Sequence, residues 1–342
     1  MQLTTIKLHS PYLIFFGDVR EHMNAKTGLG IAYWAPDRCA GQMKFRGCAV
    51  ESGLPNLNVA EALGSGVRTV IIGVAPTGGQ LQDDWFPPLL ELANAGVDIA
   101  AGLHSKLAEF PELVRAARAS GARLIDVRVP PAGLPCGTGR RRTGKRVLTV
   151  GTDCAVGKMY SALALHREFR QRNVNATFRA TGQTGIMIAG EGIPIDAVVA
   201  DFIAGAAEML SPDNESDHWA IIEGQGSLIH PSYAGVTLGL MHGSQPDALV
   251  LCHDANRELI QGVGGDFPIP PIDECIELAL SAARVTNPEC VCAGISINTS
   301  GLHEKDRADY LADLHRQHSL PVVDPVATGI APVADFLLER LV

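Results

Sequence analysis

Short apolar runs alternate with segments of helical apolar spacing along nearly the whole chain. In the first part, the runs that predict buried strands are YLIFFGD, TVIIGVA, VDIAAGLH and RLIDVRV. The segments between them place apolar residues near every 3.6 positions and end at glycine, which predicts helices: NVAEALGSG, PPLLELANAG and PELVRAARASG. Strands and helices that alternate in this way indicate an α/β fold with a parallel sheet. We expect a Rossmann-like N-terminal domain over residues 1–130, without the GxGxxG turn that would imply a dinucleotide.

The stretch 131–145 breaks this pattern with prolines, glycines and the basic run at 140–142, and it predicts a linker. Beyond it, strands are predicted at RVLTVGTD, NATFRAT, HWAIIEGQG, DALVLCHDA, CVCAGISIN and PVVDPV, and helices at DECIELALSAARV and KDRADYLADLHRQ. The second domain, residues 146–342, is therefore expected to be a parallel-sheet domain of the P-loop NTPase type.

Composition narrows the class of protein. The 342 residues are 46% apolar and 19% charged, enough for a large core. Residues 1–146 carry 17 basic and 12 acidic side chains, and residues 147–342 carry 11 and 25, so we expect no nucleic-acid partner for the acidic half. The eight cysteines lack CxxC spacing and predict reduced, cytoplasmic thiols. No apolar stretch approaches a membrane span and the start lacks signal-peptide features, so we expect no membrane association.

The segment GTDCAVGKM, residues 151–159, follows an apolar strand and precedes a helical pattern. In this context backbone N–H groups, the helix dipole and Lys158 together suit an anion, which predicts a phosphate-binding loop. The spacing is a variant, because Thr152 stands where such loops usually have glycine. The residues expected to hold a phosphorylated cofactor are Gly151, Thr152, Asp153, Cys154, Ala155, Val156, Gly157, Lys158, Met159 and Tyr160.

This loop resembles that of the dethiobiotin synthetase group, GTDTxVGKT, and the likeness extends to an apolar strand that ends in EGxG, here with Glu223 at its tip. Met159 departs from the group. There a hydroxyl ligates magnesium, whereas a thioether is a poor ligand for a cation that prefers oxygen. The chain therefore keeps the phosphate cradle without the metal hydroxyl, which suits coenzyme A better than ATP hydrolysis, and we expect no metal requirement.

Longer segments carry a more specific resemblance. Together with GTDCAVGKM, residues 178–205 and 223–253 are similar to the D-glutamate N-acetyltransferases, a bacterial family long known only as a domain of unknown function. Residues 18–42, 73–81 and 101–107 resemble its Rossmann-like half. The resemblance implies acetyl-CoA as donor and D-glutamate as acceptor, and we also expect a homo-oligomer.

Residue types suggest which side chains catalyse the acetyl transfer. Asp153 and Glu223 are the acids placed to accept a proton from the substrate ammonium; alternatively, Asp153 caps the helix and Glu223 is a remnant of a magnesium site. His230 and Tyr233 are candidates for a base or for a donor to the leaving thiolate, with a structural role as the alternative. Gln183 is a candidate donor to the acetyl carbonyl, unless it lies in a plain glycine-rich turn.

The acceptor's carboxylates call for cations. The candidates for substrate binding are Arg20, Lys26, Arg46 and Arg179, together with Thr184; solvated surface charge is the alternative for the basic ones. We expect the acceptor at the junction of the halves, beyond the carboxyl ends of strands. The run 140–142 is interpreted as solvated charge, or else as a contact for the 3′-phosphate of coenzyme A.

Two other functions remain open on the residues alone. One is an ATP-dependent ligase or kinase of the dethiobiotin synthetase type, and the other is a nucleotide-sensing regulatory protein. Met159 favours acetyl transfer over the first of these, because magnesium-dependent use of ATP needs the oxygen ligand that this chain lacks.

Overall fold

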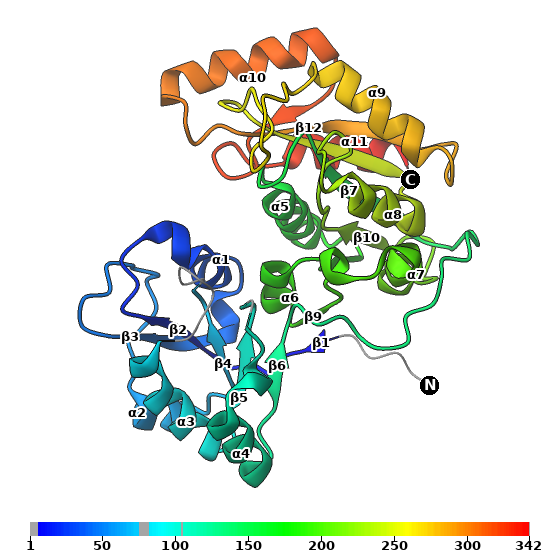
Figure 1. Cartoon of the computed structure of the whole chain (residues 1–342). Helices are drawn as coiled ribbons and strands as arrows, with labels where there is room; N and C mark the ends of the chain where they lie inside the picture. Colours follow the sequence, from blue (N-terminus) through cyan, green and yellow to red (C-terminus); the bar gives the residue numbers. More distant parts are fainter. Residues whose placement is uncertain (1–5, 75–81, 104, 342) are drawn as a thin grey trace. The chain divides into compact units, whose positions relative to one another are not determined.

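The computed structural model describes residues 6–74, 82–103 and 105–341. The chain forms two compact units: Met1–Pro131 with Gly182–Pro194, and Ala132–Thr181 with Ile195–Val342. Both are α/β units with parallel sheets, as the sequence predicts (Figure 1). Among the described residues, no helix combines the length and apolar character needed to cross a bilayer.

The first unit contains a five-stranded parallel sheet of order β3-β2-β4-β5-β6. Its strands are β2 (Tyr12–Gly17), β3 (Cys39–Lys44), β4 (Thr69–Ile72), β5 (Asp98–Ala101) and β6 (Leu124–Asp126). Its helices from the N-terminal stretch are α1 (Lys26–Trp34), α2 (Val59–Gly64), α3 (Phe86–Asn94) and α4 (Pro111–Ser120). All four predicted strands and all three predicted helices are present. The sequence did not reveal β3 and α1.

The first unit also takes a segment that the sequence placed inside the second domain. Residues 182–194 carry α6 (Gln183–Ala189) and β9 (Glu191–Gly192). Helix α6 packs against α1, and β9 pairs antiparallel with β1 (Ile6–Lys7). The structure therefore differs from the contiguous division at residue 146, because tertiary contacts rather than chain order decide where this segment belongs.

The second unit contains a six-stranded parallel sheet of order β13-β12-β11-β7-β10-β8. Its strands are β7 (Lys145–Gly151), β8 (Ala176–Arg179), β10 (Trp219–Ile222), β11 (Ala248–Asp254), β12 (Val291–Asn298) and β13 (Val322–Val323). Its helices are α5 (Lys158–Gln171), α7 (Ala200–Leu210), α8 (Ala234–Ser244), α9 (Ile272–Ala283), α10 (Glu304–His318) and α11 (Ala331–Arg340). All six predicted strands and both predicted helices are present.

Strand β7 lies between β10 and β11, and this register fixes the edge on which a site can form. Val147 lies opposite Ile221 on one side and Ala248 on the other. The three strands run parallel, so the residues after Gly151, Ile222 and Asp254 emerge at the same edge of the sheet. Ligands of parallel α/β sheets collect at such carboxyl-terminal edges.

The stretch before β7 is anchored to the second unit through Arg142, although most of its residues are exposed. Arg142 is 9% exposed and donates hydrogen bonds to the backbone oxygens of Glu208, Ser211 and Gly243. Burial lowers the pKa of Arg142 to about 10. The interpretation of 140–142 as a solvated run is wrong for Arg142, because its donors hold the ends of α7 and α8. Arg140 and Arg141 are exposed.

His166 on α5 predicts a loss of stability in mild acid. Burial lowers the pKa of His166 to about 4, and the charge of Arg170 acts in the same direction. Because the unfolded chain takes up this proton at a higher pH, the free energy of unfolding should fall between about pH 6.5 and pH 4. After allowance for partial exposure, we expect His166 to account for about 2 kcal/mol of this loss.

Urea unfolding of the wild type and His166→Gln between pH 7 and pH 4.5 measures this contribution. The variant should show a shallower pH dependence. Some dependence should persist, because burial also lowers the pKa of His218 and His253. Identical slopes for the two proteins would contradict the assignment to His166.

Candidate functional site

The predicted phosphate loop, residues 151–158, joins β7 to α5. β7 ends at Gly151 and α5 begins at Lys158. Between them the backbone is left-handed at Ala155, with φ of 55°, and at Gly157, with φ of 103°. The first amides of a helix have no acceptor within the helix, and the helix dipole adds positive potential there. A turn of this kind at the start of a helix suits an anion, so the loop is a candidate anion-binding concavity at the carboxyl-terminal edge of the sheet.

Lys158 brings a formal charge to this concavity while having little contact with water. The residue is 7% exposed, and Nζ donates to the backbone oxygen of Asp153 at 2.8 Å. Burial lowers the pKa of Lys158, and nearby thiols and the carboxylates of Asp153 and Glu223 oppose this shift. A desolvated cation gains from an anion placed against it, because the anion supplies the stabilisation that water no longer gives.

Asp153 is fully buried, and three donors hold its carboxylate. Oδ1 accepts from the N–H of Cys154 at 2.6 Å. Oδ2 accepts from the N–H of Gln261 and from Nη1 of Arg257, both at 3.0 Å. These bonds engage both oxygens of the carboxylate. The geometry favours a structural role of Asp153 within the loop over its role as a base. The alternative that Asp153 caps the helix is wrong, because the N-cap of α5 is Gly157 and no side chain caps it.

His230 is buried beside Asp153, and both of its ring nitrogens are engaged. The N–H of Ser232 donates to Nδ1 at 3.1 Å, so the proton of the neutral ring sits on Nε2. Nε2 lies 3.2 Å from the backbone oxygen of Gln261, to which it donates, and 4.0 Å from Oδ1 of Asp153. Tyr233 is half exposed, and its ring centre lies 4.5 Å from that of His230. This arrangement favours a structural role for His230 over that of a base.

Three potential metal ligands meet at this point. One ligand atom each from Asp153, Cys154 and His230 lies within 4.8 Å of the others. However, the His230 nitrogen near Asp153 is the protonated Nε2, and the carboxylate already faces the guanidinium of Arg257. A metal ion would have to displace these bonds and tolerate that positive charge. The side chains as arranged suit a hydrogen-bonded clamp, formed by Asp153, His230 and Gln261, better than a metal site.

Glu223 lies directly after β10, at the tip where the sequence placed it. The residue is 3% exposed, and Oε2 accepts from the N–H of Thr181 at 2.9 Å. The next residue, Gly224, passes so close to β7 that an added Cβ would lie 1.7 Å from the backbone oxygen of Thr149. This close approach, which only glycine permits, holds the carboxylate of Glu223 near Lys158, on whose charge it acts.

The other side chains of the loop differ in their surroundings. Thr152 is buried, with Oγ1 2.9 Å from Nδ1 of His253, while Val156 is also buried. Cys154, Met159 and Tyr160 are half-buried. Met159 follows Lys158 in the first turn of α5, so it brings a thioether to the position that carries the hydroxyl in the dethiobiotin synthetase loop.

The candidates Gln183 and Thr184 lie on α6 and therefore belong to the first unit. The side chain of Gln183 lies against Gly102, so closely that a Cβ there would come 1.9 Å from Oε1. Oγ1 of Thr184 lies 3.2 Å from Oγ1 of Thr27. The structure thus groups both with the carboxyl-terminal edge of the first sheet.

The basic candidates for the acceptor are distributed over both units. Arg179 is half-buried at the end of β8 in the second unit. Arg20, Lys26 and Arg46 are exposed in the first. Of the family-like segments, residues 75–81 and His104 lie outside the described part of the chain.

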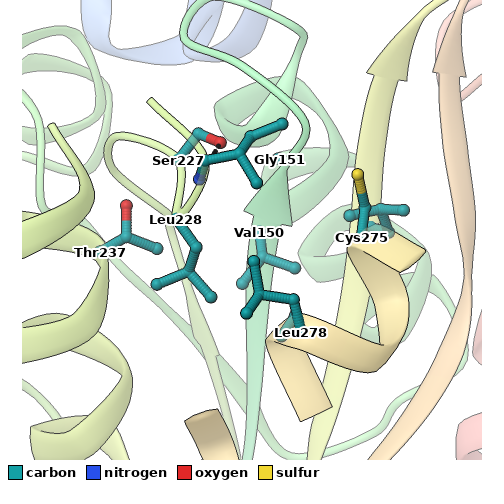
Figure 2. A pocket seen from close by; sticks show the side chains of 10 residues that line it. Val150, Gly151, Ser227, Leu228, Thr237, Cys275 and Leu278 are labelled. Carbon is teal, nitrogen blue, oxygen red and sulfur yellow. Dashed lines mark hydrogen bonds between the residues drawn. The ribbon is translucent and has the colours of Figure 1, made fainter. Parts of the chain in front are cut away.

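A small cavity lies beside the end of β7, as Figure 2 shows. Its lining is mostly apolar and includes Val150, Leu228 and Leu278, with Gly151 and Ser227 toward the loop. Its volume is about 10 Å³, the space that a single water molecule needs. The cavity is therefore too small to hold a substrate.

The sequence did not reveal Arg257 and Gln261, which follow β11 and hold Asp153. The available signal was their position, because β11 is the neighbour of β7 and its following residues emerge at the same sheet edge. The apolar patterns around them indicate only a loop.

Comparisons with known proteins place this site in context. Residues 135–334 match the sequence model of the DUF1611 P-loop domain, and residues 42–130 match that of the DUF1611_N Rossmann-like domain; both are described as domains of unknown function. A crystal structure of a DUF1611 family protein from Anabaena variabilis has a TM-score of 0.82 and 33% sequence identity. The structural match covers 97% of this chain and 100% of the Anabaena chain.

Two curated proteins are similar over almost the full length, and both are named D-glutamate N-acetyltransferase. The protein of Tritonibacter scottomollicae is 46% identical over 96% of this chain and 99% of its own. The protein of a Pseudoalteromonas species is 45% identical over 95% of this chain and 98% of its own.

Proposed function

Since this chain belongs to the DUF1611 family, we propose that it moves the acetyl group of acetyl-CoA to the amine of D-glutamate, the activity named for its two curated relatives. The observation that carries the choice of donor is the phosphate loop with its desolvated Lys158 and with Met159 in the place of the metal-binding hydroxyl. This combination suits phosphates that arrive without magnesium. It disfavours an ATP-dependent ligase or kinase, the second candidate function.

The proposed reaction needs a neutral amine and a polarised thioester. The neutral amine nitrogen attacks the carbonyl carbon, the carbon–sulfur bond breaks, and coenzyme A leaves as its thiolate, which takes up the second proton that the nitrogen loses as the amide forms. A base takes the proton that the ammonium group must lose. We assign this proton to Glu223, the acid that follows β10 and lies near Lys158 at the phosphate loop. The products are N-acetyl-D-glutamate and coenzyme A.

Acceptor selectivity tests this proposal. Both carboxylates of D-glutamate are expected to pair with cations, and a buried cation left without its partner is costly. D-Glutamine and D-alanine should therefore show kcat/KM values at least about 10-fold below that of D-glutamate. The measurement is the release of the free thiol from acetyl-CoA with D-glutamate, L-glutamate, D-glutamine and D-alanine, in EDTA and in magnesium.

Chelation should leave the rate unchanged. Equal rates with all acceptors would contradict the proposed pairing of the acceptor's carboxylates with cations of the protein. Tight, strictly magnesium-dependent binding of ATP with none of acetyl-CoA would instead favour the ligase or kinase.

A further inference from the structure

Arg257 is a second cation at the phosphate loop, beside Lys158. It comes from the segment that follows β11, and its side chain is 11% exposed. Nη1 donates to Oδ2 of Asp153 at 3.0 Å and to the backbone oxygen of Cys154 at 2.8 Å. Both contacts are to residues of the loop itself, so the guanidinium is held against the anion-binding concavity.

The bonds to the loop occupy only one nitrogen of this guanidinium. An arginine has five N–H donors, and two of the three nitrogens remain. In the part of the chain that the structure describes, Nε and Nη2 of Arg257 have no hydrogen-bond acceptor, and neither is among the buried polar atoms that lack a partner. These donors therefore reach solvent and are available to an incoming group.

The guanidinium is also held in a fixed orientation. Gln261, four residues further on, donates its N–H to the same Oδ2 of Asp153 and accepts from His230. The clamp of Asp153, His230 and Gln261 thus fastens the segment that carries Arg257. Burial raises the pKa of the Cys154 thiol, while Lys158 and Arg257 both lower it, so both cations lie within electrostatic range of one loop atom.

We propose that Arg257 binds the phosphates of the acetyl donor. It supplies the positive charge that a magnesium ion supplies in phosphate loops that carry a hydroxyl residue where this chain has Met159. This inference rests on the proposed function and names a binding residue for it. A guanidinium matches the geometry of phosphate oxygens and never loses its charge at ordinary pH. Since Met159 offers a poor metal ligand, a fixed arginine replaces the metal without a further cofactor.

The test compares donors with and without the phosphates. Acetyl-CoA and acetyl-pantetheine share the thioester, but acetyl-pantetheine carries no phosphate. Arg257→Met should raise the Kd for acetyl-CoA about 10-fold and lower its kcat/KM to a similar degree, while kcat/KM for acetyl-pantetheine should stay within about twofold. Arg257→Lys should lose less, because it keeps the charge without the planar fork.

Arg316→Met is the matched control, because it removes an equal charge from an exposed position on α10. It should leave the preference for acetyl-CoA unchanged. If Arg257→Met keeps the wild-type preference, or loses activity with both donors alike, Arg257 only supports the loop and the proposal is overturned. If the wild type transfers acetyl from neither donor, the proposed function itself fails.

Discussion

Glu223→Gln is expected to lower the turnover of acetyl transfer about 100- to 10,000-fold, the range typical for loss of a general base. Glutamine keeps the shape of the side chain and an oxygen that can accept from the N–H of Thr181, the contact that Oε2 makes now. What it lacks is the ability to take a proton from the acceptor amine. Because a base acts only on that amine, acetyl-CoA binding should change much less than turnover.

Steady-state kinetics with D-glutamate, together with calorimetric binding of acetyl-CoA, separate the two effects. Glu215→Gln provides the control, because Glu215 is an exposed acid of the same unit that bonds Asn175. An unchanged turnover would remove Glu223 from catalysis. Equal losses in turnover and affinity would indicate that Glu223 holds the donor rather than acting as a base.

Removing the amine of Lys158 should weaken acetyl-CoA binding by about 1.5–3 kcal/mol, the range for hydrogen bonds to charged groups. The cation is buried and its pKa is lowered by that burial, so a bound phosphate stabilises it more than it would a solvated lysine. The loop amides remain in Lys158→Ala, which is why residual binding is expected. The affinity of the wild type should be the same in EDTA and in magnesium.

Calorimetry on the wild type, Lys158→Ala and Lys305→Ala measures this effect. Lys305 is an exposed lysine at the start of α10, and its substitution should leave the affinity for acetyl-CoA unchanged. If Lys158→Ala binds acetyl-CoA as the wild type does, the phosphates do not lie over this loop.

The two experiments together report the conformation of the donor. A flexible pantetheine arm separates the phosphates of acetyl-CoA from its thioester. Glu223 lies near Lys158, so both predictions hold only when that arm folds back toward the loop. A loss of affinity in Lys158→Ala without a loss of turnover in Glu223→Gln would place the transfer step away from the loop.

The sequence predicted the sheets well because most of their strands are continuous apolar runs. β2, for example, is buried at every position. β3 escaped because its sequence, CAGQMK, includes Gln42, which is buried through hydrogen bonds to Leu54 and Ser52 that no local pattern reveals. α1 escaped because Gly28 and Gly30 weaken helical propensity; a Cβ at Gly28 would lie 2.5 Å from the ring of Phe16.

The candidate site likewise has one part that the sequence predicted and another that it did not. The phosphate loop is local in sequence, so its strand, turn and helix were predictable from one segment. The clamp is not local, since Arg257 and Gln261 reach Asp153 across more than 100 residues. Sequence reasoning left His230 open between base and structural residue, and only the contact with Ser232 shows where its proton sits.

The segment 182–194 has a consequence for how the protein is made. The chain passes between the two units three times, after residues 131, 181 and 194. During synthesis, the sheet strands of the first unit leave the ribosome early, but α6 is translated about 150 residues after its partner α1, and β9 about 185 residues after its partner β1. The first unit therefore stays incomplete until part of the second has emerged, and its exposed surfaces need protection during that interval. For the same reason, recombination between genes at residue 131 would separate residues 182–194 from the rest of the first unit.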